Sequence, residues 1–318
     1  MGKYILKRIL LLIPTTFVVC LIVFAMLRCI PGSAVDAMLY KYQSMGNTSA
    51  TREDIEVMMG MDKPAAQQFF IWLGDAVRGD LGDSLFQNES VGHCILRQIG
   101  PSIELGIITL ILQFLISIPV GVLCAAKQDS VADYVIRVVS LIMMSMPVFW
   151  LATIVLVYPA KLWGWAPTTE YYSFFTDPLK NLSIMIIPAI LGAITTAGMQ
   201  LRYVRTVTLD TMRMDYVRTA RAKGVNGTKI LFKHSLRNAM IPVITLIGGA
   251  VSMLVGGSVI MENLFSIPGI GNQVVVALSN RDYPIVQGCV LVFSIFTMVV
   301  NMIVDISYKW LDPRVKLD

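Results

Sequence analysis

Six long stretches without a single Asp, Glu, Lys or Arg constrain this chain more than any other feature. Each has 19 to 24 residues, and they are Ile9–Leu27, Leu105–Ala126, Val138–Ala160, Asn181–Leu201, Asn238–Met261 and Tyr283–Val304. A helix rises about 1.5 Å per residue, so each stretch can cross a hydrocarbon core of roughly 30 Å. At 15% charged residues, the chain also falls below the level of about a quarter found in soluble domains. We therefore predict an all-α integral membrane protein with six transmembrane helices.

The positions of Lys and Arg predict how these helices are oriented. If the amino terminus is cytoplasmic, 17 of the 26 basic residues lie on the inner side. Six of the nine outer ones lie on or beside a single long segment, where the positive-inside rule has little weight. We expect both termini to be cytoplasmic. The net charge of +5 then reflects topology and indicates no nucleic-acid partner.

Neither the first apolar stretch nor the cysteines indicate a secreted protein. The stretch is longer than the 7–15 residues usual in a signal peptide, and no small-x-small cleavage site follows it, so an uncleaved first helix is expected. The five cysteines show no CxxC spacing and predict neither a disulfide framework nor a zinc site.

Between the first two stretches lies a long outer segment, Pro31–Arg97. Thr51-Arg-Glu-Asp54 is typical of a helix amino terminus, and apolar residues in Gln67–Val77 follow roughly helical spacing. Two or three short helices forming an extracytoplasmic cap fit this pattern. A loop that packs only on its own transmembrane helices fits it about equally well.

The inner segment Arg202–Arg237 carries nine basic residues. One helical face can be shared by Met212, Tyr216, Val217 and Ala220. Gly224 is a plausible helix stop, and a second helix should begin near Thr228 and continue into the fifth stretch. The residues alone leave three interpretations open: a membrane-surface helix, a solvated connector, or a docking element for a cytosolic partner.

Short motifs recur in order along nearly the whole chain. The inner segment contains Asp215-Tyr-Val-Arg-Thr-Ala-Arg-Ala-Lys-Gly224 and His234-Ser-Leu-Arg-Asn-Ala-Met-Ile-Pro242. The others are Tyr4-Ile-Leu-Lys-Arg-Ile-Leu10, Pro31-Gly-Ser33, Arg78-Gly-Asp-Leu-Gly-Asp-Ser84, Pro101-Ser-Ile-Glu-Leu105, Pro268-Gly-Ile-Gly271, Asn280-Arg-Asp-Tyr-Pro284 and Asp312-Pro-Arg314. Together they resemble the permeases of bacterial ABC importers, and more narrowly the B-type subunit of the dipeptide, oligopeptide and nickel permease family.

The resemblance implies a type I importer fold and a short cytoplasmic coupling helix that sits in a cleft of the ATP-hydrolysing subunit. The residues implied in this contact are Asp215, Tyr216, Arg218, Thr219, Ala220, Arg221, Ala222, Lys223 and Gly224. Small side chains would permit close approach, and the cations could pair with acidic rims. The chain departs from the general loop motif, because Arg218 and Thr219 replace its Glu and first Ala, and Arg237 replaces a later Pro. This form resembles the peptide branch of the family.

By the same resemblance, the outer segment Glu262–Asp282 would contain an external gate near the docking place of a substrate-binding protein. The gate residues implied are Glu262, Pro268, Gly269 and Gly271. On composition alone, a surface loop is nearly as good an interpretation. The implied partners are a second homologous permease subunit, two cytosolic ABC ATPase subunits, an extracytoplasmic substrate-binding protein and the lipid bilayer.

No catalytic or metal-binding motif was found. HExxH and GxSxG are absent, and Gly224-Val-Asn-Gly-Thr-Lys229 has Thr where a P-loop needs Lys directly after Gly. We expect this chain to be no enzyme, to hold no catalytic residue, metal or cofactor, and to rely on ATP and Mg bound by partner ATPases. The helical spacing of Met143, Met144 and Met146 favours packing over metal binding.

A few polar residues lie at or near membrane depth, where an ionisable or polar group is a functional candidate. They are Glu104, Gln113 and Asp305. For the two carboxylates, a structural hydrogen bond is favoured over contact with substrate. Kinks are predicted at Pro119, Pro147, Pro159 and Pro188.

The function that these observations predict is that of an inner-membrane permease subunit, forming half of the pathway of an ATP-driven importer for peptides or related small solutes. A nickel or metal-chelate importer on the same scaffold is the alternative. A secondary transporter or an intramembrane hydrolase would need charged or catalytic residues inside the spans, and the six stretches contain no charge. The expected domains are residues 1–98 (first helix and outer segment), 99–311 (core of five helices) and 312–318 (cytoplasmic tail).

Overall fold

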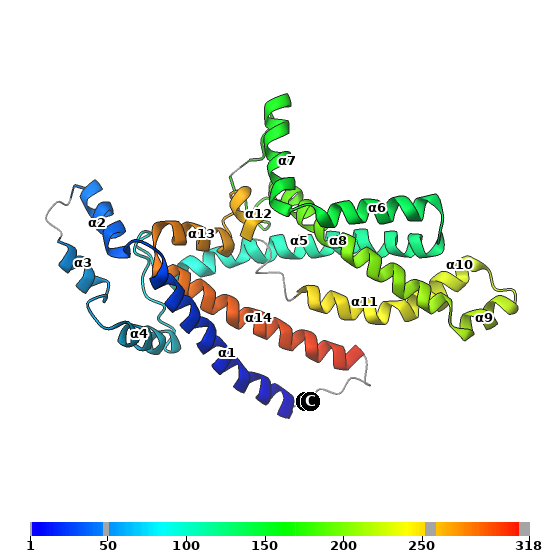
Figure 1. Ribbon diagram of the computed structural model, residues 1–318, viewed down its shortest axis with the longest axis horizontal. Helices are drawn as coiled ribbons and strands as arrows, with labels where there is room; N and C mark the ends of the chain where they lie inside the picture. Colours follow the sequence, from blue (N-terminus) through cyan, green and yellow to red (C-terminus); the bar gives the residue numbers. More distant parts are fainter. Residues whose placement is uncertain (1, 47–50, 169, 252–258, 312–318) are drawn as a thin grey trace. The chain divides into compact units, whose positions relative to one another are not determined.

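The computed structural model describes residues 2–46, 51–168, 170–251 and 259–311 (Figure 1). Over these residues the chain consists of helices, and the only β pairing is an isolated bridge between Asp83 and Ser90. The all-α prediction is confirmed. Residues 252–258 of the fifth predicted span, and the predicted tail at 312–318, lie outside the described residues.

Four helices are long and apolar enough to cross a membrane singly, and two bent pairs raise the number to six if each pair forms one span. The single spans are Ile5–Cys29, Val91–Ala126, Pro178–Met212 and Tyr283–Ser307. The pairs are Val131–Ser145 with Val148–Trp163, and Gly227–Met240 with Pro242–Val251. These correspond in order to the six stretches predicted from the sequence.

The break in the third span is sharp. The helices α6 (Val131–Ser145) and α7 (Val148–Trp163) meet at 91°. Met146 is extended, with φ −84° and ψ 124°, because a residue before proline is driven out of the helical region. Pro147 also lacks the N–H that would continue the helix. The other three prolines expected to cause kinks lie inside α5, α7 and α8, which continue through them.

The chain divides into two compact units, each described here by itself. Unit 1 comprises Met1–Ser102 and Pro268–Met302, and unit 2 comprises Ile103–Ile267 and Ile303–Asp318. Two helices run from one unit into the other: α5 (Val91–Ala126) and α14 (Tyr283–Leu311).

Unit 1 contains α1 (Gly2–Cys29), α2 (Ala34–Ser44), α3 (Arg52–Met58), α4 (Ala65–Val77) and α13 (Ile270–Asn280), with parts of α5 and α14. Its main core packs side chains from α1, α5, α13 and α14, including Leu27, Val91, Ile270 and Ile285. A smaller cluster places Phe69 of α4 against Phe24 of α1. The outer segment therefore holds three short helices, as the pattern predicted, and α4 is packed on a membrane-spanning helix.

The start of α3 shows how the predicted capping sequence works. The Thr51 side chain accepts a hydrogen bond from the Asp54 amide, and the Asp54 carboxylate accepts one from the Thr51 amide at 3.0 Å. Hydrogen bonds from the Thr51 hydroxyl and amide hold the pKa of the Asp54 carboxyl below its ordinary value. The acidic residue in the first turn thus completes a capping box.

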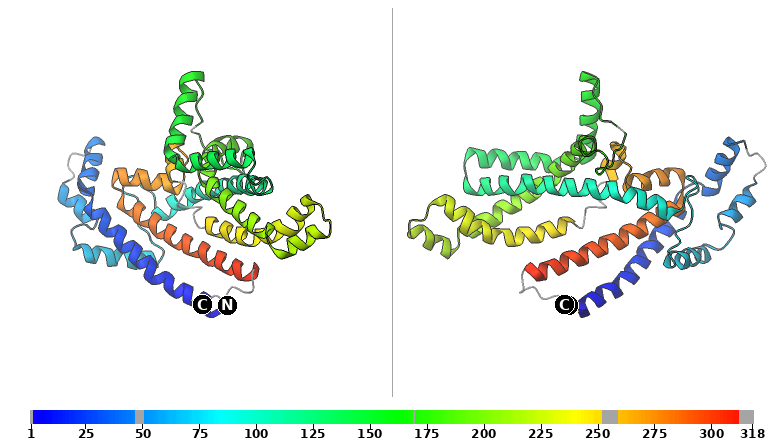
Figure 2. Two further views of the ribbon diagram at one scale, coloured as in Figure 1. Left: turned by 45° about the vertical axis from the view of Figure 1, so that its right-hand side comes forward. Right: turned by 180° about the vertical axis from the view of Figure 1, so that it is seen from behind.

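Unit 2 contains α6, α7, α8 (Pro178–Met212), α9 (Asp215–Ala222), α10 (Gly227–Lys229), η1 (Ile230–Ser235), α11 (Leu236–Val251) and α12 (Val259–Leu264). The long helix α8 packs against both α6 and α11, which Figure 2 shows from two further directions. Its buried side chains include Met185, Ala189 and Val204. Because α8 touches most of the other helices of this unit, it positions both candidate sites described next.

Candidate functional site

The residues predicted to couple to a partner form the separate short helix α9, which directly follows α8. Arg213 ends α8, and the extended backbone of Met214 starts α9. Val217 and Ala220 of α9 are buried and pack with Ile230 of η1. This contact anchors α9 against the next helical segment, so its orientation is held by packing on one face.

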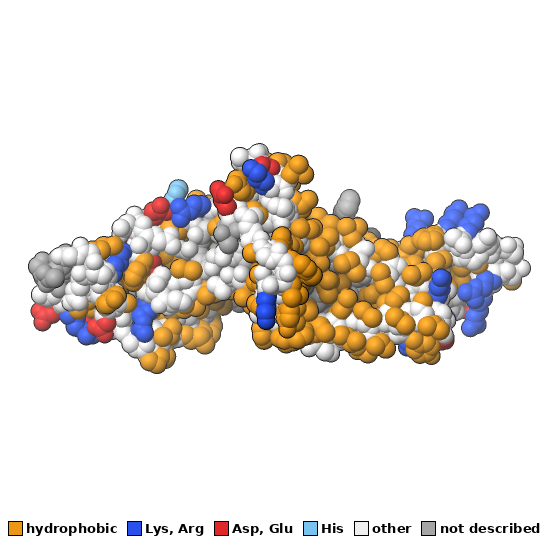
Figure 3. All heavy atoms as spheres, turned by 90° about the horizontal axis from the view of Figure 1, so that it is seen from above, with side chains coloured by type: hydrophobic (Ala, Val, Ile, Leu, Met, Phe, Trp, Pro, Cys, Tyr) orange, Lys and Arg blue, Asp and Glu red, His pale blue; other side chains and the backbone are white. Residues whose placement is uncertain are grey.

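The opposite face of α9 is open. The residues exposed on it or just beyond it are Asp215, Tyr216, Arg218, Thr219, Arg221, Ala222, Lys223 and Gly224. Figure 3 shows Lys and Arg side chains gathered over the end of unit 2 where α9 and α10 lie. Arg218 is paired only loosely with Asp215, at 3.7 Å, and both side chains are largely exposed. Of the nine predicted coupling residues, the structure leaves eight exposed and buries Ala220.

Two features fix the chain where it leaves α9. Gly224 adopts φ +76°, a left-handed conformation that favours glycine, and ends the helix as predicted. Asn226 then caps the next turn by accepting a hydrogen bond from the Thr228 amide at 2.9 Å. The predicted second helix near Thr228 is therefore confirmed.

A polar contact ties α9 to the helix that follows. The Asn238 amide donates to the Tyr216 hydroxyl and to the His234 carbonyl, each at 3.0 Å. Tyr216 thus lies on the exposed face and also braces α9 against η1 and α11. Together with the packing of Val217 and Ala220, this hydrogen bond fixes the position of α9 relative to η1 and α11.

A buried ion pair near the start of α6 was missed by the sequence analysis. Asp133, with no exposed side-chain surface, accepts hydrogen bonds from both Nε and Nη2 of Arg205 on α8, at 2.8 and 2.7 Å. The Asp129 amide and the Arg137 guanidinium also face this carboxylate. The bidentate geometry locks the start of α6 to α8. In sequence, its signal was an acidic residue just before an apolar stretch and an arginine just after one.

A cavity of about 600 Å³ lies in unit 2 among α5, α6, α7, α8, α11 and α12. Most of its lining is apolar. The polar residues that line it are Thr109, Gln113, Thr195, Thr196 and Gln200. Of these, only Gln113 was predicted from the sequence as a functional candidate. The usable signal was the spacing of four residues between Thr109 and Gln113, and between Thr196 and Gln200, which puts each pair on one helix face.

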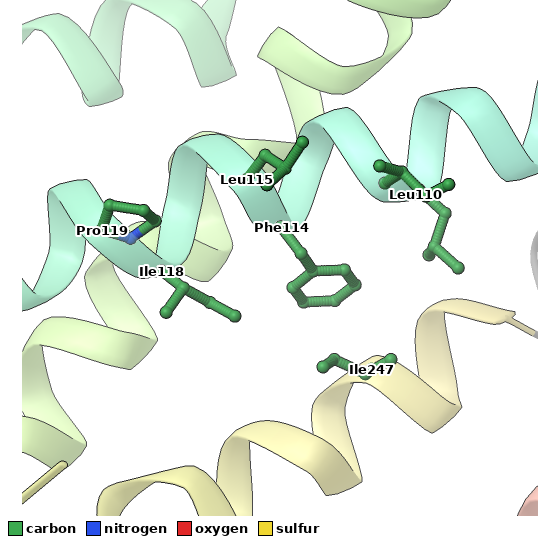
Figure 4. Close-up of a pocket in the computed structure, with 7 residues that line it drawn as sticks. Leu110, Phe114, Leu115, Ile118, Pro119 and Ile247 are labelled. Atoms are coloured by element: carbon green, nitrogen blue, oxygen red, sulfur yellow. The ribbon is translucent and has the colours of Figure 1, made fainter.

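A second hollow in unit 2 has a different character. It measures about 430 Å³ and is lined by seven apolar residues of α5 and α11. Figure 4 shows Phe114 and Ile118 of α5 projecting toward Ile247 of α11. This hollow offers no polar group to a solute, so the cavity lined by Gln113 is the better candidate for a pathway.

The residues predicted for an external gate are divided between the two units. Glu262 lies on α12 in unit 2 and is buried. Pro268, Gly269 and Gly271 lie in unit 1, where Gly269 precedes the first turn of α13. The helix breaks after Leu264 and restarts at Ile270. The role of these residues as a gate stays a prediction.

Other residues named from the sequence have structural partners. Glu104 accepts a hydrogen bond from the Tyr171 hydroxyl at 3.0 Å, in line with the structural interpretation. Asp305 is half-buried on α14.

All five cysteines are free thiols. Within the described ranges, no three His, Cys, Asp or Glu side chains gather into a group that could hold a metal ion.

Comparison with known proteins agrees with the motifs. Residues 117–317 match the family described as the binding-protein-dependent transport system inner membrane component. A putative peptide permease protein of Brucella ovis is 36% identical over 324 residues and is covered fully, as is this chain. A di/tripeptide transport system permease protein of Pseudomonas aeruginosa is 35% identical, with 99% of each chain covered. A dipeptide transport system permease protein of Alkalihalophilus pseudofirmus is 33% identical over 99% of this chain and 100% of its own.

A family match over more than half of the chain, together with relatives similar over their full length, agrees with the helices long enough to span a membrane. The chain therefore belongs to the binding-protein-dependent transport system inner membrane components, the permease family of ABC importers.

Proposed function

We propose that this protein forms half of the translocation pathway of an ATP-driven importer for peptides or related small solutes, and that α9 couples it to separate ATPase subunits. The observation that carries this proposal is the geometry of α9. It is a short helix held by Val217 and Ala220 on one face, with cationic side chains exposed on the other. That arrangement suits a rigid element that receives force from a partner with an acidic surface.

The path of α8 supports coupling from α9 to the pathway. The same helix lines the cavity through residues between Gly192 and Gln200. Only two residues separate its end at Met212 from the start of α9 at Asp215. Arg205 lies between these two places and joins α8 to α6. A displacement of α9 would therefore act on the helix that lines the cavity. Since a ligand shifts a two-state element only through differential affinity, the ATPases must contact α9 differently in the inward-open and outward-open states.

The substrate class is inferred from the relatives. The relatives compared are named as peptide, dipeptide or di/tripeptide permeases. Their names do not support the nickel or metal-chelate alternative. An ion-coupled secondary transporter is disfavoured by membership in a binding-protein-dependent family.

The remaining parts of the proposal concern partners and topology. The complete importer would contain a second related permease, two cytosolic ATPases that bind ATP and Mg, and an extracytoplasmic binding protein. Both termini would be cytoplasmic in the inner membrane, which places α9 inside and α2–α4 outside. The segment with Pro268 and Gly271 would then serve as an external gate near the binding protein.

The coupling role is tested by co-purifying ATPase subunits with the tagged chain in mild detergent. The double variant Arg218→Glu with Arg221→Glu reverses two exposed charges without disturbing the buried face of α9. We expect ATPase recovery to fall roughly tenfold, which corresponds to about 1.4 kcal/mol of binding free energy. Exposed positions suit this test better than the buried Ala220. A large side chain at Ala220 would displace α9 from Ile230, so a loss of ATPase binding could then reflect misfolding.

Lys127→Glu is the matched control, since Lys127 is exposed in the turn after α5 and outside α9. It should leave ATPase recovery unchanged. Equal recovery for the double variant and the wild type would contradict docking through α9. If wild-type protein from its native host brought down no ATPase subunit, the importer mechanism itself would be wrong.

A further inference from the structure

The polar residues of the cavity form two matched stripes. On α8, Gly192, Thr195, Thr196, Met199 and Gln200 all line the cavity, at the spacing of one helix face. On α5, Thr109 and Gln113 do the same, four residues apart. Both stripes end in glutamine. Side-chain amides and hydroxyls inside a membrane-spanning bundle are costly unless they serve structure or function.

The hydrogen bonds around Gln113 leave its donor available. The Thr196 hydroxyl lies within donating distance of Gln113 Oε1, at 2.9 Å, and of the Gly192 and Ala193 carbonyls of its own helix, at 3.0 and 3.1 Å. Within the described part of the chain, the Nε2 group of Gln113 donates to no protein atom. Gln113 is 6% exposed, so this amide is enclosed and held at the cavity wall.

The second glutamine, Gln200, offers a hydrogen-bond acceptor where Gln113 offers a donor. Gln200 lines the same cavity and is 8% exposed. Its Oε1 atom has no hydrogen-bond partner among the described residues. A buried acceptor without a partner costs free energy, so its retention in a native protein calls for an explanation. A solute that donates a hydrogen bond would provide one.

The other residues that line the cavity indicate which chemical groups of a solute could bind there. None of the described residues around the cavity carries a charge. A neutral donor and a neutral acceptor on an apolar wall match the C=O and N–H of a peptide bond. The volume of about 600 Å³ lies within the roughly 300–1,000 Å³ typical of small-molecule sites.

We propose that Gln113 and Gln200 form a recognition site for a backbone amide of the transported peptide, with Gln113 donating to the peptide carbonyl and Gln200 accepting from the peptide N–H. This inference rests on the proposed function and adds a specificity element to the pathway. The permease itself then discriminates between solutes that have a peptide bond and isosteric solutes that lack its N–H.

The test compares uptake of labelled tri-alanine with uptake of a depsipeptide analogue in which one amide N–H is replaced by an ester oxygen. The complete importer, with its binding protein and ATPases, is reconstituted in proteoliposomes. The variants Gln113→Met and Gln200→Met keep the side-chain length and remove the amide. We expect each to lower tri-alanine uptake roughly tenfold, as for loss of about one or two buried hydrogen bonds. In Gln200→Met, which loses the acceptor for the peptide N–H, the ratio of tri-alanine to depsipeptide uptake should also fall toward the value set by the binding protein alone. In Gln113→Met the ratio should be retained, because both substrates keep the carbonyl that Gln113 contacts.

Gln128→Met is the matched control, because Gln128 is exposed in the turn after α5, lies outside the cavity lining and undergoes the same loss of an amide. Stimulation of ATP hydrolysis by the binding protein should be unchanged in all three variants, which separates loss of recognition from loss of folding or assembly. If the Met variants are poorly assembled, Gln113→Asn and Gln200→Asn shorten the side chain but keep the amide, and should reduce uptake while preserving discrimination. Unchanged uptake and discrimination in assembled Gln113→Met and Gln200→Met importers would overturn the site alone. Failure of the wild-type importer to take up tri-alanine would contradict the proposed function, and the site with it.

Discussion

Glycines set the distance between helices in unit 2. A Cβ atom added at Gly121 on α5 would lie 2.8 Å from both the Leu201 carbonyl oxygen and Val204 Cβ of α8. At Gly198 on α8, the corresponding distance to the Ser140 carbonyl oxygen of α6 is 2.9 Å. Small residues permit such close backbone approach between membrane helices, where packing rather than the hydrophobic effect drives association.

Two glycines in the same helix provide a direct test of this packing. We expect Gly121→Ala to destabilise the protein by about 1–3 kcal/mol, because the new methyl group meets backbone that cannot easily move. Gly92→Ala, also in α5 and followed by no proline, meets nothing within 4 Å and should leave stability unchanged or raise it by about 0.5 kcal/mol through helix propensity. Thermal denaturation of the purified protein in detergent measures both. Equal shifts for the two variants would show that the α5–α8 approach is not tight.

At the scale of elements, the ion pair between Asp133 and Arg205 holds α6 against α8, although α6 is separated from α7 by a sharp bend. The span that begins with α6 turns by 91° at Pro147, so α6 is not a continuous rod with α7. The bidentate contact, with both Arg205 nitrogens within 2.8 Å of the carboxylate, holds the amino-terminal end of α6 on α8. Buried ion pairs contribute little net stability, and their best-supported role is to specify one arrangement.

Breaking one side of this pair should cost more than removing both. Arg205→Met leaves Asp133 enclosed without its main partner, and Asp133→Leu leaves the guanidinium without its carboxylate, so each single variant should lose about 3–5 kcal/mol. The double variant Asp133→Leu with Arg205→Met should be more stable than either single variant. A thermodynamic cycle from denaturation midpoints measures the coupling. Simple additivity of the two losses would contradict a direct, buried pair.

For the whole molecule, the distribution of charge predicts which surfaces face the cytoplasm. The basic end of unit 2 that contains α9 is expected inside, and the three short helices α2 to α4 are expected outside. The spans are long enough to cross a membrane, and the Lys and Arg residues of the connecting segments decide which side each segment faces.

Cysteine labelling in intact spheroplasts tests this orientation. Four of the five native cysteines are buried, so only Cys29 needs replacement by Ser. In that background, Val77→Cys at the end of α4 should react with a membrane-impermeant maleimide, and Lys223→Cys beyond α9 should react only after permeabilisation. Both original residues are exposed, which makes the two positions comparable. The reverse pattern would place the termini outside.

Much of the fold follows from local patterns in the sequence. The charge-free runs predicted the spans, Thr51 and Asp54 predicted the start of α3, and Gly224 predicted the end of α9. Each of these signals acts within a few residues of the chain: helix length, capping and left-handed backbone are local properties. The short-motif resemblance identified the family for the same reason, since every motif is contiguous.

What only the tertiary structure decided are the contacts between residues far apart in sequence. The pairing of Asp133 with Arg205, and of Gln113 with Thr196, joins residues 72 and 83 positions apart. The burial of Ala220 on one face of α9, which leaves the other eight predicted coupling residues exposed, likewise depends on Ile230 from another element. Sequence by itself determined which segments become membrane helices, because apolar length and charge decide that locally. Which side chains line the cavity depends on how α5 and α8 are rotated toward each other, and helix packing alone sets that rotation.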